Sequence, residues 1–245
     1  MWKGRGTSFR LTTSAKPGCI CGQKSSHLPH QNRGDKINAR PSGTAPFLLH
    51  PQNLNTPLDW RISELPLKGE WLNLAAGDGR YTQELLDKVD SLTAVDIDGV
   101  ALKKLKAHVS GRDTVLKTQI ADITKKLPFQ DHSFDGVLCT GSLHLFSKSV
   151  LRKIFPEIHR VLKQSGKFVI DFAVDIKRQY QNPTAGAKKI KPNYTLRSAK
   201  ALLETLLKDY NIQMYTSEFA DDVSNIEEFG FITKGKFILV VGEKR

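Results

Sequence analysis

The chain has 245 residues, 39% of them hydrophobic, and its 37 lysines and arginines outnumber its 25 aspartates and glutamates to give a net charge of +12. This length can bury a substantial core, and because no apolar run approaches about eighteen residues, we expect no membrane span. The three cysteines, Cys19, Cys21 and Cys139, are too few for a framework of several disulfides, which favours a reducing compartment and a cytoplasmic protein.

Half of the net charge lies in the first quarter of the chain. Residues 1–60 carry 8 basic and 2 acidic side chains, and residues 1–54 are rich in Gly, Ser, Thr, Pro, Asn and Gln without helical or strand periodicity. We therefore predict a disordered basic tail over residues 1–54. An organelle-targeting peptide and an electrostatic arm for RNA or another polyanion are the alternatives. The single residue between Cys19 and Cys21 is too short a spacing for a typical structural zinc site, so we expect no metal.

From residue 55 onward, apolar segments typical of strands alternate with segments that have helical spacing. The expected strands are 70–74, 91–95, 114–120, 134–139, 167–172, 212–219 and 237–241. The expected helices are 79–88, 99–110, 150–162 and 198–210. Pro156 predicts a break or kink in the third helix near Phe155. This alternation is typical of βαβ units, so we predict a Rossmann-like α/β domain over residues 55–245, with a mainly parallel sheet and helices on both faces.

Polar groups or glycines follow the first three expected strands, and ligands of such sheets bind beyond the carboxyl ends of the strands. The glycine-containing turn 75–79 follows the first strand, Asp96 the second and Asp122 the third. Asp96 could accept hydrogen bonds from ribose hydroxyls, and Asp122 from an exocyclic amine. Each acid alone is also typical of a turn or a helix cap. A dinucleotide is the weaker prediction, because the G-x-G-x-x-G fingerprint would place Thr82 at its third glycine.

The same residues resemble a known family. Residues 72–80, Leu-Asn-Leu-Ala-Ala-Gly-Asp-Gly-Arg, resemble motif I of the class I S-adenosylmethionine-dependent methyltransferases, and Asp96 matches the ribose-binding acid of that family. Residues 127–137 and 158–166 are similar to two further segments of its type 11 subgroup. The resemblance covers about residues 65–172 and says little about the substrate.

The resemblance implies a seven-stranded sheet with an antiparallel last strand, and a cofactor, S-adenosylmethionine, that lies across the ends of strands one, two and four. The cofactor-binding residues that it implies are Asn73, Ala75, Gly77, Gly79, Asp96, Ile97, Asp122, Ile123 and Cys139. Asn73 stands where the family usually has an acid and Ala75 where it has its first glycine, which weakens cofactor binding at worst. We expect the Cys139 thiol to be a packed core group rather than a nucleophile.

The acceptor would meet the loop after the fourth strand and the basic segment 176–197. His144 is the candidate general base, although a packed loop histidine is an equal interpretation. Between residues 176 and 200 there are seven basic side chains and no acid, and the substrate-facing candidates there are Lys177, Arg178, Tyr180 and Tyr194. A lid with this charge suits an anionic small molecule or RNA as the acceptor, and a merely solvated basic loop is the alternative.

Two functions therefore stay open. The first is a methyltransferase that acts on an anionic small molecule or on RNA. The second is a catalytically weak protein of the same fold that serves as an RNA- or protein-binding module. The sequence does not specify an oligomeric state.

Overall fold

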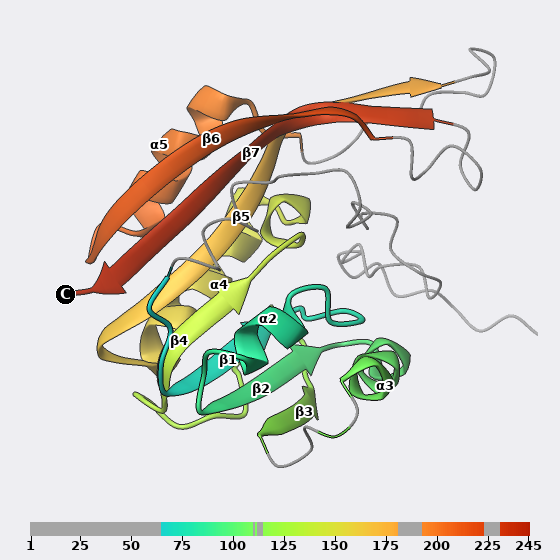
Figure 1. Cartoon of the computed structure of the whole chain (residues 1–245). Helices are drawn as coiled ribbons and strands as arrows, with labels where there is room; N and C mark the ends of the chain where they lie inside the picture. Colours follow the sequence, from blue (N-terminus) through green and yellow to red (C-terminus); the bar gives the residue numbers. More distant parts are fainter. Residues whose placement is uncertain (1–64, 110, 112–114, 181–192, 223–230) are drawn as a thin grey trace, which may run out of the picture. The chain divides into compact units, whose positions relative to one another are not determined.

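The computed structural model describes residues 65–109, 111, 115–180, 193–222 and 231–245 (Figure 1). The predicted tail over residues 1–54, most of the central part of the basic segment and the acidic loop before the last strand lie outside these ranges. No helix in the described part of the chain is long and apolar enough to cross a membrane.

The described residues form one sheet of seven strands in the order β3-β2-β1-β4-β5-β7-β6. The strands are β1 Glu70–Leu74, β2 Ser91–Asp96, β3 Leu116–Ile120, β4 Phe134–Cys139, β5 Leu162–Tyr180, β6 Tyr210–Asp222 and β7 Phe231–Lys244. The pairs among β1 to β5 are parallel, and β7 is antiparallel to both β5 and β6. The predicted seven-stranded mixed sheet with an antiparallel last strand is confirmed. Strand order reverses between β1 and β4, where a ligand crevice forms in such sheets.

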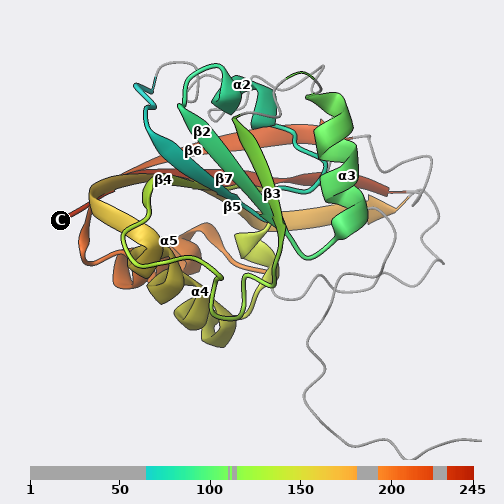
Figure 2. The same ribbon diagram turned by 90° about the horizontal axis from the view of Figure 1, so that it is seen from below.

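Helices cover both faces of the sheet (Figure 2). The helices are α2 Thr82–Leu86, α3 Gly99–His108, α4 Lys148–Val161 and α5 Leu196–Leu206. Leu85 of α2 and Leu105 of α3 pack with Leu138 of β4 in one core. Ile154 of α4 and Leu203 of α5 belong to the core on the opposite face. Adjacent strand residues point to opposite faces, so each central strand contributes to both cores.

All four helices differ from their predicted extents by a few residues. α2 begins three residues later than expected because Gly79 has a φ of +94°, which is not helical. Of the break or kink predicted near Phe155, the break does not occur, because α4 continues through Pro156. Pro156 is exposed, and so is Arg152, whose carbonyl loses its helical partner at residue 156. Water can hydrogen-bond this carbonyl on the solvent side of the helix.

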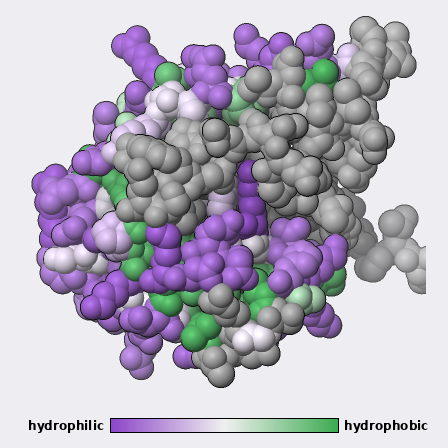
Figure 3. All heavy atoms as spheres, viewed as in Figure 1, coloured by the Kyte–Doolittle hydropathy of each residue, from purple (hydrophilic) through white to green (hydrophobic). Residues whose placement is uncertain are grey.

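Three strands are much longer than their apolar patterns predicted. β4 ends at Cys139, which pairs with Ile170, whereas β5 continues to Tyr180 and stays paired with β7 over this length. β7 pairs in turn with β6, so an antiparallel extension projects past the end of β4 (Figure 1). Its apolar side chains form a small core of their own, made of Ala173, Ile176, Phe219 and Phe237. Hydrophilic side chains dominate the described surface in the corresponding space-filling view (Figure 3).

Candidate cofactor and acceptor site

The turn at residues 75–79 leaves β1 with three residues in the left-handed region. The φ angles are +53° at Ala75, +58° at Gly77 and +94° at Gly79. A Cβ at Gly79 would lie 2.7 Å from Leu105 of α3, so this glycine permits close packing of the turn on the helix. A Cβ at Gly77 would meet nothing within 4 Å in the described part of the chain, so the main chain of the turn is open there on that side. Ala75 keeps a strained conformation that glycine would adopt more readily.

Asp96 ties this turn to the end of β2. The side chain is buried, and its carboxylate accepts hydrogen bonds from the N–H of Gly77 and the N–H of Asp98, each at 2.9 Å. One carboxylate oxygen is used for each bond, and each oxygen has a second lone pair. Asp96 can therefore hold the turn in place and still accept hydrogen bonds from a ligand hydroxyl.

Three large apolar side chains are exposed beside Asp96. Ile97 follows β2, Val100 lies in the first turn of α3, and Ile120 ends β3, with 57%, 62% and 61% of their surfaces exposed. An apolar surface at the carboxyl ends of β2 and β3 suits the flat face of a purine. Ile97 was among the predicted residues, but Val100 and Ile120 were not. Val100 recurs at helical spacing with Leu102 and Leu105, and a single sequence cannot show which of these apolar positions faces a ligand.

Four further predicted residues are held within the fold. Asp122 accepts hydrogen bonds from the N–H of Thr124 at 2.8 Å and from its hydroxyl at 2.7 Å on the same oxygen, as in a turn cap. Ile123 and Cys139 are buried in the core, so a contact of either residue with a cofactor would have to come from its main chain. Asn73 is 3% exposed, within β1.

The candidate base and the predicted lid residues divide into packed and accessible groups. His144 is buried in the short 3-10 helix Leu143–Leu145, with its ring 6.3 Å from that of Phe172. Tyr194 is buried against the same ring and donates its hydroxyl to the carbonyl oxygen of Phe146 at 2.7 Å. Both side chains belong to the packing around Phe172. By contrast, Lys177 is exposed, and Arg178 and Tyr180 are half-buried, all on the extension of β5.

One acid that the sequence did not single out is Asp171 of β5. It is 7% exposed, and the N–H of Gly141, in the loop after β4, donates to its carboxylate at 2.6 Å. Burial raises the pKa of the Asp171 carboxyl to about 6, against the opposing effects of the Gly141 N–H and of the charge on Arg80. The sequence did contain a signal for this residue, because Asp171 is the acid within the apolar stretch 168–174. Its hydrogen-bond partner, Gly141, is 30 residues away in sequence and could not be predicted from the local pattern.

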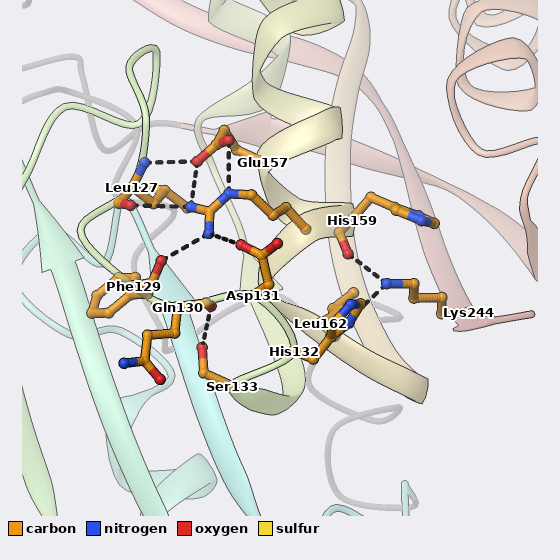
Figure 4. Close-up of polar contacts among 11 residues, drawn as sticks. Leu127, Phe129, Gln130, Asp131, His132, Ser133, Glu157, His159, Leu162 and Lys244 are labelled. Atoms are coloured by element: carbon orange, nitrogen blue, oxygen red, sulfur yellow. Dashed lines mark hydrogen bonds and ion pairs between the residues drawn. The ribbon is translucent and has the colours of Figure 1, made fainter.

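The segments 127–137 and 158–166, which carry part of the resemblance, are joined by hydrogen bonds from Arg160. Figure 4 labels the residues that accept these bonds. The Arg160 guanidinium makes two bonds to the Glu157 carboxylate, at 2.7 and 3.0 Å, and one to Asp131 at 2.8 Å. It also donates to the carbonyl oxygens of Phe129 at 2.8 Å and Leu127 at 3.1 Å. The hydrogen bonds from Arg160 lower the pKa of both carboxyl groups. These segments therefore position β4 and α4 rather than a ligand.

Comparison with known proteins agrees with this geometry. Residues 72–170 match the family described as Methyltransferase domain. An uncharacterized methyltransferase of Synechocystis is 29% identical over 51% of this chain and 58% of its own length. YqeM of Bacillus subtilis, described as a methyltransferase, is 32% identical over 46% of this chain and 45% of its own. The chain thus spans about half the length of these curated relatives.

A solved structure shows the same fold. An S-adenosylmethionine-dependent methyltransferase of Methanosarcina mazei superposes with a TM-score of 0.58 and 18% identity, over 77% of this chain and 97% of that one. The matched residues include the turn at 75–79, Asp96 and the Arg160 contacts. Residues 72–170 therefore match the methyltransferase domain family, and the described sheet has the fold of a class I S-adenosylmethionine-dependent methyltransferase.

Proposed function

We propose that this chain transfers a methyl group from S-adenosylmethionine to an anionic acceptor, either a small molecule or RNA. The main observation that supports a transferase function is the position of Asp96. Its carboxylate accepts a hydrogen bond from the N–H of Gly77, next to the side of the turn that is open. A buried carboxylate, an open glycine main chain and an exposed apolar surface then lie at neighbouring strand ends. This combination fits a ribose, an amino-acid chain and a purine, which are the three parts of the cofactor.

In this proposal, each part of the cofactor has its own group of residues. Asp96 binds the ribose hydroxyls, and the main chain of residues 75–79 lies along the methionine portion. Ile97, Val100 and Ile120 cover the adenine face. The cofactor supplies an electrophilic methyl group on a positively charged sulfur. The protein then contributes mainly by holding an acceptor in line with that group, because orientation supplies much of the rate in such displacements.

The charge of the extension supports an anionic acceptor. Lys177 of β5 is exposed and pairs across the strands with Lys234 of β7, so two cationic side chains neighbour each other beyond the end of β4. Lys236 is the next cation along β7, and its ammonium forms an ion pair with Glu218 at 2.7 Å. A carboxylate or phosphate close to Lys177 would gain a favourable charge contact at this end of the extension. Both small anions and RNA phosphates offer this chemistry.

Calorimetry with S-adenosylmethionine tests the cofactor site. We expect the wild type to bind, Asp96→Ala to lose most of its affinity, and Asp90→Ala to bind like the wild type. Asp90 is the matched control because it is exposed at the opposite, amino end of β2. Equal binding by the Asp96→Ala variant would refute the assigned role of Asp96.

Transfer of labelled methyl groups tests the acceptor class. The full chain is incubated with labelled S-adenosylmethionine and with separate small-molecule, RNA and protein fractions of a cell extract. We expect label in the small-molecule or RNA fraction. Label in protein alone would refute the anionic acceptor proposed here. Binding of RNA without transfer to any fraction would favour the alternative, a methyltransferase-fold binding module.

A further inference from the structure

Asp171 of β5 lies at the edge of the sheet formed by the carboxyl ends of the parallel strands. It is next to β4, one of the two strands between which the ligand crevice is expected. Cys139 is the last residue of β4 and pairs with Ile170, so Asp171 is the first residue of β5 beyond the end of its parallel neighbour. The loop that follows β4 passes over this position, and its Gly141 N–H donates to the Asp171 carboxylate. Asp171 therefore borders the region where ligands of such sheets bind.

The side chain of Asp171 also projects to the face of the sheet that carries the cofactor turn. Val169, two residues earlier on β5, packs with Leu138 and Trp71 in the core beneath α2 and α3. Alternate residues of a strand share a face, so Asp171 points to the same side. Arg80, at the end of the 72–80 motif, is close enough for its charge to act on the Asp171 carboxyl.

The main chain around the Asp171 carboxylate leaves room for another molecule. Gly141 has a φ of +66°, and a Cβ there would meet no described residue within 4 Å. Among the described residues, the Gly141 N–H is the hydrogen-bond donor to Asp171, and no ion pair within 4 Å involves this carboxylate. A nearly buried carboxylate with one donor is unfavourable for folding, so a functional role explains its presence.

We propose that Asp171 faces the methyl group of the bound cofactor and accepts a proton from the methyl acceptor, which is a hydroxyl or an uncharged amine that carries a hydrogen. This inference rests on the proposed function. The acceptor oxygen or nitrogen gives an electron pair to the methyl carbon and forms the new bond. The carbon–sulfur bond breaks with its electron pair going to sulfur, and the acceptor proton goes to the free oxygen of Asp171. An acceptor atom that carries no proton, such as a thioether sulfur, would not need this group.

The location of Asp171 can be tested without an acceptor. Sinefungin is a cofactor analogue in which a carbon replaces the sulfur and carries a positively charged amine in place of the methyl group, whereas S-adenosylhomocysteine is uncharged there and lacks the methyl group. We expect Asp171→Asn to weaken sinefungin binding by about 10- to 100-fold and to change S-adenosylhomocysteine binding by less than about 3-fold. The amide oxygen of Asn still accepts the Gly141 N–H, so the loop stays anchored.

Asp135→Asn is the matched control. Asp135 also accepts a main-chain N–H, that of Glu70 at 2.8 Å, but it lies at the amino end of β4. We expect this variant to bind both compounds like the wild type. In the wild type, the preference for sinefungin over S-adenosylhomocysteine should decrease when the pH is lowered below about 6. Burial raises the pKa of the Asp171 carboxyl to about 6, despite the opposing charge of Arg80, so the carboxyl becomes protonated and uncharged there.

Two results would overturn the assigned location, and a third would overturn the assigned chemistry. An equal change in both affinities for Asp171→Asn, or no change in either, would mean that Asp171 does not face the methyl position. If the wild type bound neither compound, the proposed function would fail first. In the labelled-methyl assay, Asp171→Asn should lower transfer by about 100-fold or more. Unchanged transfer with weakened sinefungin binding would refute proton acceptance.

Discussion

Replacing Asp171 by Asn is expected to stabilise the fold at neutral pH. Burial raises the pKa of this carboxyl from its ordinary value of 3.8 to about 6. Below about pH 4, the acid is protonated in both the folded and the unfolded chain, and its ionisation contributes nothing to the free energy of unfolding. Above about pH 6, it is ionised in both states, and the folded chain carries the full unfavourable burial of the charge. A difference of about two pKa units corresponds to about 3 kcal/mol.

The gain from Asp171→Asn should therefore be near zero at pH 4 and rise to at most about 3 kcal/mol at pH 8. Urea denaturation of both proteins across this range measures it, and the comparison at each pH removes the effect of the other titrating groups. Asp135→Asn should show the opposite trend, because the Glu70 N–H and the Lys163 ammonium outweigh partial burial and lower the pKa of Asp135. Destabilisation of Asp171→Asn at pH 8 by more than about 1 kcal/mol would refute the reasoning.

Other variants test the turn and the contacts around α4. Arg160→Lys should lower the free energy of unfolding by about 3 kcal/mol in the same urea assay, because an ammonium cannot replace the five hydrogen bonds of the guanidinium. The control is Arg152→Ala on the exposed side of α4, which should change the free energy of unfolding by less than about 0.5 kcal/mol. Gly79→Ala should lower the melting temperature strongly, since its Cβ would lie 2.7 Å from a leucine of α3, whereas Gly77→Ala should mainly weaken S-adenosylmethionine binding in calorimetry; a larger melting shift for Gly77→Ala would contradict this assignment. Burial lowers the pKa of Lys244, so the charged ammonium is unfavourable in the folded chain. The free energy of unfolding of the wild type relative to Lys244→Met should therefore increase as the pH rises from this lowered pKa to the ordinary value of 10.5. A difference that does not change with pH would contradict this prediction.

Local patterns in the sequence were enough to predict the order and type of the elements. Strands and helices have different periods of apolar residues, and the turn at 75–79 and Asp96 sit next to apolar strands that were easy to recognise. Because carboxyl ends of parallel strands meet at one edge, the proximity of these residues followed from the strand order alone. The seven-stranded sheet and the methyltransferase family were therefore predicted correctly.

The tertiary structure decided what depends on contacts between distant segments. The β5 extension is polar at Lys177 and Arg178, and it is a strand because β7 pairs with it, not because of its own apolar pattern. Asp171 acquires its environment from Gly141, and Arg160 binds carbonyl oxygens about 30 residues earlier in the chain. The sequence by itself determined the cofactor edge, since that edge is built from short local motifs. Only the packed fold placed a buried acid beside it, because burial and hydrogen-bond partners are set by long-range pairing.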